Sequence, residues 1–198
     1  MRLVLASASP RRRELLARAG YRFSVITSDI PEVRADDESP LAYTRRLARS
    51  KAEAVLARVL DTQVAVLGAD TTVAVEHDGR EHVLEKPLDA ADAERMLRLL
   101  SARAHHVYTA IAVARRDRQR VVTDVRHART EVFFRALTDS AIAGYIATGE
   151  PFDKAGGYGI QGKASPFIER WEGDYDNVVG LPVYLVREML GDPDGYEG

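Results

Sequence analysis

The sequence predicts an α/β fold with a mixed central sheet and flanking helices. Strand and helix patterns alternate through the first half of the chain, which is typical of α/β proteins. A long hairpin is predicted after them, so the sheet should contain antiparallel as well as parallel strands. With 198 residues, 45% of them hydrophobic and 29% charged, the chain suits one domain or two closely joined lobes.

Apolar periodicity and turn residues predict the elements of the first half. Alternation before Asp78-Gly79 marks that pair as a hairpin turn. The remaining expectations are strands at 3–6, 21–26, 64–69 and 72–76, helices at 11–19 and 41–60, and a polar, acidic loop at 31–40.

The elements of the second half are predicted from helix-capping residues and from the residues that begin or end a helix. Asp89 should cap a helix over 90–100, and Thr138 should begin another that ends near Gly149. Further predictions are paired strands at 107–115 and 121–134 across a polar turn at 116–120, a last helix from Pro182 to about Leu190, and a loose tail at 191–198.

Composition excludes several classes of protein. The chain has no cysteine, so a disulfide framework, a thiolate zinc site and a cysteine nucleophile are all excluded. The net charge of -2 provides no general basic excess for a nucleic acid. No apolar run approaches the roughly 18 residues of a membrane span, and the N-terminal segment does not have a signal-peptide pattern. We therefore expect a soluble, cytoplasmic protein with no nucleic-acid or membrane partner.

The glycine-rich segment 157–163 contains two misleading motifs. Gly157, Gly159 and Gly162 match a dinucleotide fingerprint, but no buried strand precedes them and Pro166 interrupts the helix that should follow. The same segment nearly matches a phosphate-binding P-loop, except that Ala164 replaces the required Ser or Thr. We expect instead a loop whose backbone approaches a ligand closely.

A phosphate site is predicted where the first strand meets the first helix. Ser7 follows the strand, Pro10 suits the first turn of the helix, and Arg11 and Arg12 follow at once. Helix N-termini, hydroxyls and guanidinium groups all attract phosphates. The structural alternative is a capped helix with solvated arginines, and Arg13 is expected to be solvated in either case.

Asp70 is the candidate catalytic carboxylate. It follows an apolar strand within Gly68-Ala69-Asp70-Thr71-Thr72, where a carboxylate can hold Mg²⁺ or orient a water molecule. An aspartate that caps a turn is the alternative. Lys51 and Lys86 are weaker candidates, since a helical lysine usually extends to solvent and Lys86 alone resembles a surface lysine. The histidines show no metal-binding spacing.

Taken together, these segments resemble the Maf family of nucleotide pyrophosphatases. The resemblance covers nearly the whole chain, to about Leu190. The resemblance rests on five segments in the family's order: LASASPRRRELL, GADT, EKP, LSARAHHVYTAIAV, and FDKAGGYGIQG with GDYDNVVGLP. It implies one domain over 1–190, a fold similar to inosine triphosphate pyrophosphatases with two lobes around a cleft, and a homodimer. Ala102, Ala110 and Glu85 stand where the family usually has glycine.

The resemblance also assigns roles to residues. It implies that Asp70 is the catalytic acid/base, and that Asp70 and Glu32 hold Mg²⁺ or Mn²⁺. It implies phosphate contacts from Ser7, Arg11, Arg12, Lys51 and Lys86, and base specificity from Arg11, Thr71 and Gln161.

The expected reaction is hydrolysis of a nucleoside triphosphate at the α-phosphorus, giving the monophosphate and pyrophosphate. The GGYGIQG and GDYDNVVGLP segments resemble the branch of the family that acts on dTTP and UTP, a house-cleaning activity. The alternatives are the same chemistry on 7-methyl-GTP or another nucleotide, and a nucleotide-binding regulator of cell division. A nucleic-acid binder built on the arginine cluster is the third alternative, against which the net charge argues.

Overall fold

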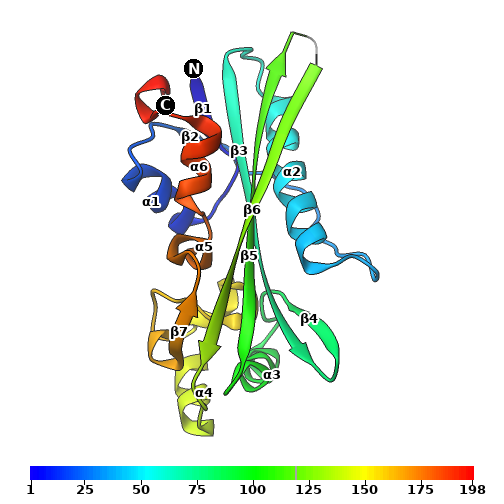
Figure 1. Ribbon diagram of the computed structural model, residues 1–198, viewed down its shortest axis with the longest axis vertical. Helices are drawn as coiled ribbons and strands as arrows, with labels where there is room; N and C mark the ends of the chain where they lie inside the picture. Colours follow the sequence, from blue (N-terminus) through cyan, green and yellow to red (C-terminus); the bar gives the residue numbers. More distant parts are fainter. Residues whose placement is uncertain (119) are drawn as a thin grey trace. The chain divides into compact units, whose positions relative to one another are not determined.

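The structure is a computed structural model that describes residues 1–118 and 120–198 (Figure 1). Its strands form one mixed sheet in the order β2-β1-β3-β5-β6-β7, with β4 paired to β3, which confirms the predicted α/β class. The strands are β1 Arg2–Leu5, β2 Ser24–Val25, β3 Val64–His77, β4 Arg80–Leu84, β5 Ala104–Asp117, β6 Arg120–Phe134 and β7 Ile168–Glu172. The α-helices are α1 Pro10–Arg18, α2 Pro40–Arg58, α3 Ala90–Leu100, α4 Asp139–Ile146, α5 Tyr175–Val179 and α6 Val183–Leu190.

The chain divides into two compact units. The first comprises residues 1–70, 109–128 and 180–198, and the second comprises residues 71–108 and 129–179. Strands β3, β5 and β6 each contribute residues to both units. Helices α1, α2 and α6 belong to the first unit, whereas α3, α4 and α5 belong to the second.

In the first unit, parallel strands carry helices on both sides. Strand β1 pairs in parallel with β2 and with β3. Helix α2 lies on one side of these strands, and α1 and α6 lie on the other (Figure 1). The core beneath α2 is made of small and branched side chains, namely Val4, Ala6, Ala48, Ala52, Val55, Leu56, Val59, Val64, Val66, Ala110, Ala112 and Ala114.

Two Ser-Pro pairs start the helices of the first unit. The Ser9 side chain accepts a hydrogen bond from Arg12 N, and the Ser39 side chain accepts one from Ala42 N. Each serine thus binds an amide of the first turn that has no carbonyl partner within the helix. The following prolines occupy the first helical position, where their missing N–H is no loss. These local contacts explain why both helix starts lie within one residue of the predicted ones.

The C-terminal residues are not the loose tail that the sequence predicts. Leu3 N donates to Glu197 O at 3.0 Å, and Glu197 N donates to Met1 O at 3.0 Å. Tyr196 is buried, packs edge-on against Tyr21, and its hydroxyl donates to Leu190 O at 2.9 Å. Both chain ends therefore lie together (Figure 1), because strand β1 offers backbone groups that a flexible tail would leave unpaired.

Two predicted strands differ from those observed. The strand predicted at 21–26 shortens to β2, since Tyr21 N donates to Leu16 O and so closes helix α1 instead of pairing with a strand. The strands predicted at 64–69 and 72–76 form a single strand, β3. The turn predicted at 116–120 includes Gln119, which lies outside the described residues.

The second unit confirms most of the local predictions. Strands β3 and β4 pair in an antiparallel hairpin whose turn residues Asp78 and Gly79 both have positive φ, as a two-residue turn requires. Asp89 caps α3 and Thr138 caps α4 through their side-chain oxygens. Strand β7 pairs antiparallel with β6. Among the described residues, no helix has both the length and the apolar character of a membrane span.

Candidate active site

Lys51 joins the two carboxylates predicted to act together. Its Nζ lies 2.7 Å from Asp70 Oδ1 and 2.7 Å from Glu32 Oε1. The Lys51 and Asp70 side chains are 9% and 8% exposed, whereas that of Glu32 is 45% exposed. Lys51 therefore does not extend to solvent, as a helical lysine usually does; its ammonium group forms ion pairs with both carboxylates.

A close approach between α2 and β3 explains how Lys51 reaches Asp70. A Cβ atom on Gly68 would lie 2.7 Å from Ala52 N and still nearer to Ala48 O, so only glycine allows this spacing. Gly68 and Asp70 are two residues apart on the strand. Ala48 and Ala52 flank Lys51 on the helix, and the close packing therefore sets the distance between Lys51 and Asp70.

Asp70 lies inside strand β3 rather than at its end, which corrects the sequence-based placement. The strand continues to His77 because the residues after Asp70 alternate and remain largely buried. The alternative of an aspartate that caps a turn is therefore wrong. The carboxylate is buried in the strand, beside Lys51 and in the field of Arg12.

The electrostatic environment of Asp70 combines opposing effects. Burial raises the pKa of Asp70, while Lys51 and Arg12 act to lower it and Glu32 adds to the increase. Burial likewise lowers the pKa of the Arg12 guanidinium, and Asp70 and Glu32 oppose that decrease. Two cations and two carboxylates thus lie close together, and charge interactions are strongest between the buried Lys51 and Asp70.

The start of α1 supplies a second cluster of polar groups. Ser7 Oγ accepts from Ser9 N at 3.2 Å and from Arg12 Nη1 at 3.3 Å. Arg12 Nε donates to Gly180 O at 2.9 Å, which holds the guanidinium in place. Arg11 is half-buried in the first turn of α1, and Arg13 is exposed, as predicted. Local sequence could not predict the contact between Arg12 and Gly180, because the two residues lie 168 positions apart in the chain.

The structure thus brings together five of the predicted site residues, Ser7, Arg12, Glu32, Lys51 and Asp70, in the first unit. Thr71 follows Asp70 in β3 and begins the second unit. Lys86, exposed between β4 and α3, and Gln161, exposed in the glycine-rich segment, also belong to the second unit. The roles of all these residues stay predictions.

The glycine-rich segment is neither a dinucleotide fingerprint nor a P-loop. The 3-10 helix Glu150–Asp153 precedes it, a second at Ala155–Gly157 includes its first residue, and a third at Ser165–Phe167 follows it. The Glu150 carboxylate accepts from Lys163 N at 3.0 Å and touches the place where a Cβ on Gly162 would lie. Gly162 therefore lets this carboxylate organise the turn that carries Gln161.

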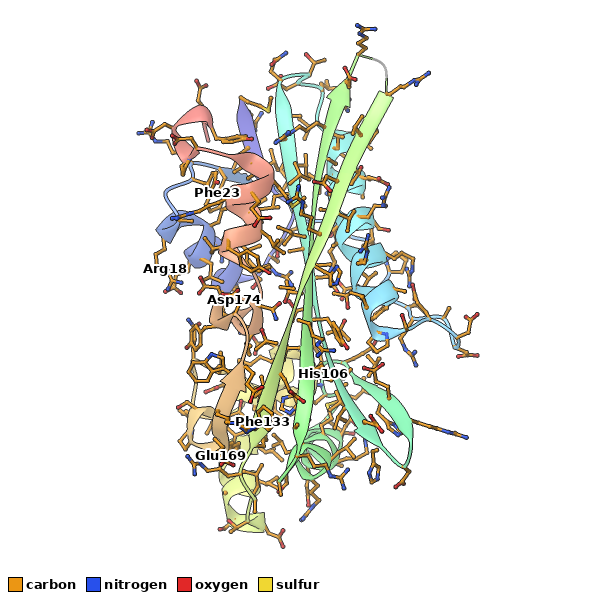
Figure 2. All side chains as sticks on the ribbon, in the orientation of Figure 1. Arg18, Phe23, His106, Phe133, Glu169 and Asp174 are labelled. Carbon is orange, nitrogen blue, oxygen red and sulfur yellow. The ribbon has the colours of Figure 1, made fainter. Side chains whose placement is uncertain are left out.

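His105 contacts the glycine-rich segment through Tyr158. Its Nε2 lies 2.7 Å from the Tyr158 hydroxyl, and its buried Nδ1 has no hydrogen-bond partner among the residues that the structure describes. The adjacent His106, labelled in Figure 2, lies on β5 with Nε2 3.7 Å from Glu131 Oε1. Neither histidine belongs to the cluster around Asp70.

A divalent cation is compatible with the carboxylates present. Among the residues that the structure describes, no three His, Cys, Asp or Glu side chains form a metal-binding group. Glu32 and Asp70 nevertheless each place an oxygen 2.7 Å from the same Lys51 nitrogen, so the two carboxylates are neighbours. Mg²⁺ often binds through one or two carboxylates, with phosphates and water completing its shell. These donors fit an ion that arrives with a triphosphate.

The chain is similar to known proteins over almost its whole length. The family model described as Maf-like protein matches residues 2–192. A dTTP/UTP pyrophosphatase of Moorella thermoacetica is 52% identical over 189 residues, which are 96% of this chain and 93% of that protein. Proteins with the same name from Vibrio vulnificus and Vibrio cholerae are 48% and 47% identical over 189 residues, covering 96% of this chain and 97% and 96% of theirs.

Proposed function

The chain belongs to the Maf-like protein family, and on this premise we propose that it hydrolyses dTTP and UTP to the monophosphate and pyrophosphate. The choice of substrate rests on the names of relatives that share about half of its residues over nearly its whole length. The chemistry rests on one observation, the placement of Lys51 between the carboxylates of Glu32 and Asp70.

Each group of the cluster has a task in this reaction. A triphosphate carries several negative charges, so catalysis requires mainly positioning and electrostatic stabilisation. Arg12 and Lys51 supply positive charge, and Ser7 and the first turn of α1, with Arg11, supply hydrogen-bond donors for phosphate oxygens. Asp70 orients the attacking water and accepts its proton, a role that suits a carboxylate whose pKa is raised by burial.

A divalent cation, Mg²⁺ or Mn²⁺, completes the proposal. It would be held by Asp70 and Glu32 and would neutralise charge on the phosphate oxygens. Lys86 would add a phosphate contact, and Arg11, Thr71 and Gln161 would distinguish the base. A homodimer and a cytoplasmic location belong to the same proposal and rest on the resemblance to the family.

The test is a screen of nucleoside triphosphates with Mg²⁺, with and without a chelator, carried out in H₂¹⁸O. We expect dTTP and UTP to be hydrolysed fastest, no reaction with the chelator, and ¹⁸O in the monophosphate, because water attacks the α-phosphorus. Orthophosphate as the first product would refute the mechanism. A preference for 7-methyl-GTP would move the chain to another substrate class, and binding without hydrolysis would indicate a regulator.

A further inference from the structure

Glu32 lies in a segment that has little structure of its own. Between β2 and α2, residues 28–38 contain one turn, at Asp36 and Asp37, and otherwise neither helix nor strand. The Glu32 side chain is 45% exposed, so packing does little to hold it. An ion pair that is half exposed to water is also weak on its own. Something else must keep the Glu32 carboxylate beside Lys51.

Helix α2 holds the backbone at Glu32 directly. The Tyr43 hydroxyl donates to Glu32 O at 3.0 Å, and Arg46 Nη2 donates to Val33 O at 2.9 Å. Tyr43 is buried, and the Arg46 guanidinium lies 5.4 Å from the centre of its ring. Two consecutive carbonyl groups are thus bound to the same helix that carries Lys51.

The same arginine also holds the end of the segment. Arg46 Nε and Nη2 donate to the two Glu38 carboxylate oxygens at 2.7 and 2.6 Å, a bidentate pair. The Glu38 side chain is only 13% exposed, and the Arg46 hydrogen bond lowers its pKa, so it stays ionised. Arg34 Nη1 donates to Glu38 O at 2.7 Å, which closes the segment on itself.

We propose that Arg46 and Tyr43 are positioning residues, which hold the segment 32–38 on α2 so that the Glu32 carboxylate stays at Lys51. This inference rests on the proposed function, because it gives Glu32 its role at the cation and the phosphates. Neither Arg46 nor Tyr43 touches substrate in this scheme; both act through Glu32. Lys51 and Asp70 should remain paired without them, since both side chains are buried.

The experiment compares Arg46→Ala, Arg46→Lys and Tyr43→Phe with the control Arg49→Ala. Arg49 lies on the same helix, and its ion pair at 3.5 Å is with Glu53 of that helix rather than with segment 32–38. Mn²⁺ binding is followed by electron paramagnetic resonance, hydrogen exchange of amides 30–38 is measured without substrate, and kcat is measured at saturating Mn²⁺. A positioning role predicts faster exchange and about 10- to 100-fold weaker Mn²⁺ binding in Arg46→Ala, with kcat at saturation less affected.

The variants separate positioning from simple stability. Arg46→Lys keeps the charge but loses the guanidinium fork, so it should behave like Arg46→Ala. A purely structural role would lower the melting temperature and the active fraction while leaving Mn²⁺ affinity unchanged. Arg49→Ala should match the wild type in every measurement.

A double-mutant comparison decides whether Arg46 acts through Glu32. In Glu32→Ala protein, adding Arg46→Ala should weaken Mn²⁺ binding no further, because the group it positions is already absent. A further weakening equal to that seen in the wild type would overturn the inference, as would unchanged exchange and Mn²⁺ affinity in Arg46→Ala. If the wild type hydrolyses no nucleotide, the proposed function fails, whereas exchange and Mn²⁺ binding still decide the role of Arg46.

Discussion

Lys51 Nζ lies 2.7 Å from Asp70 Oδ1, and both side chains are almost entirely buried. A buried ion pair contributes little net stability, because removing two charges from water offsets most of their attraction. The pair is therefore better explained by its use than by stabilisation of the fold. Lys51 also contacts Glu32, so it would keep one acidic partner if the charge of Asp70 were removed.

Asp70→Asn should leave the protein folded and nearly inactive. The amide accepts a proton poorly, and losing a general base typically costs about 10²- to 10⁴-fold in rate. Circular dichroism tests whether the variant is folded, and kcat on dTTP tests whether it is active. The control is Asp139→Asn, which removes an exposed carboxylate paired with Arg98 and should keep full activity. Wild-type kcat in folded Asp70→Asn would show that the carboxylate has no catalytic role.

Gly68→Ala should both destabilise the protein and lower its kcat. The added Cβ would collide with Ala48 O and Ala52 N of α2, and overpacking of this kind costs about 1–3 kcal/mol. A shift of α2 would also move Lys51 away from Asp70. Urea unfolding and kcat measure the two effects.

The control for Gly68 is Gly144→Ala in α4, where no atom of the described residues, apart from the neighbouring residues and backbone of the helix itself, lies within 4 Å of the added Cβ. Because alanine favours a helix more than glycine does, this variant should be stabilised by about 0.5–1 kcal/mol. Equal stability of the two variants would contradict the close-packing argument.

His105 should make the protein sensitive to acid. Burial lowers its pKa to about 3, compared with about 6.5 in the unfolded chain. As the pH falls below about 6.5, the unfolded chain binds a proton that the folded protein does not, so the free energy of unfolding decreases. At pH 5 this decrease amounts to about 2 kcal/mol.

His105→Gln tests this linkage. At pH 8 the free-energy difference between variant and wild type reports the lost contacts of the imidazole with Tyr158 and Phe134. Between pH 8 and pH 5 the difference should change by about 2 kcal/mol in favour of the variant, as measured by urea unfolding. If the free energy of unfolding had the same pH dependence in both proteins, His105 would not be neutral and buried in the folded state.

Gln161→Ala should reduce base selectivity more than turnover. The amide can pair with the O4 and N3–H edge of uracil or thymine, whereas cytosine reverses that pattern. Gln161 is exposed in the free protein, but once a bound base covers its amide, leaving that amide unpaired would cost about 1–3 kcal/mol. UTP should therefore be preferred over CTP by roughly 5- to 150-fold in kcat/KM. The variant should lose most of that preference.

A matched variant controls for disorder of the loop that carries Gln161. Glu150→Gln weakens the acceptor of Lys163 N without removing the Gln161 amide, so it should slow all substrates alike. A uniform loss in Gln161→Ala as well would show that Gln161 only supports the loop.

Local sequence was sufficient to locate most elements and several candidate residues. The Asp89 and Thr138 caps and the Asp78-Gly79 turn depend on contacts within four residues, so they could be predicted without knowledge of the fold. Asp70 was identified by its position next to an apolar strand and by the resemblance to a family. That reasoning nevertheless split β3 in two, because periodicity alone does not show that Asp70 is accommodated inside a strand.

Chain pairing and close packing decided what local sequence could not. Lys51 has the pattern of a solvated helical lysine, and only Gly68, which lets α2 approach β3, places it at Asp70. The chain end has the composition of a loose tail, yet Glu197 pairs with β1 nearly two hundred residues away. By itself the sequence determined the elements and the chemical groups, since caps and turns form between near neighbours; the tertiary structure decided which groups share buried space, since burial depends on partners that are distant in the chain.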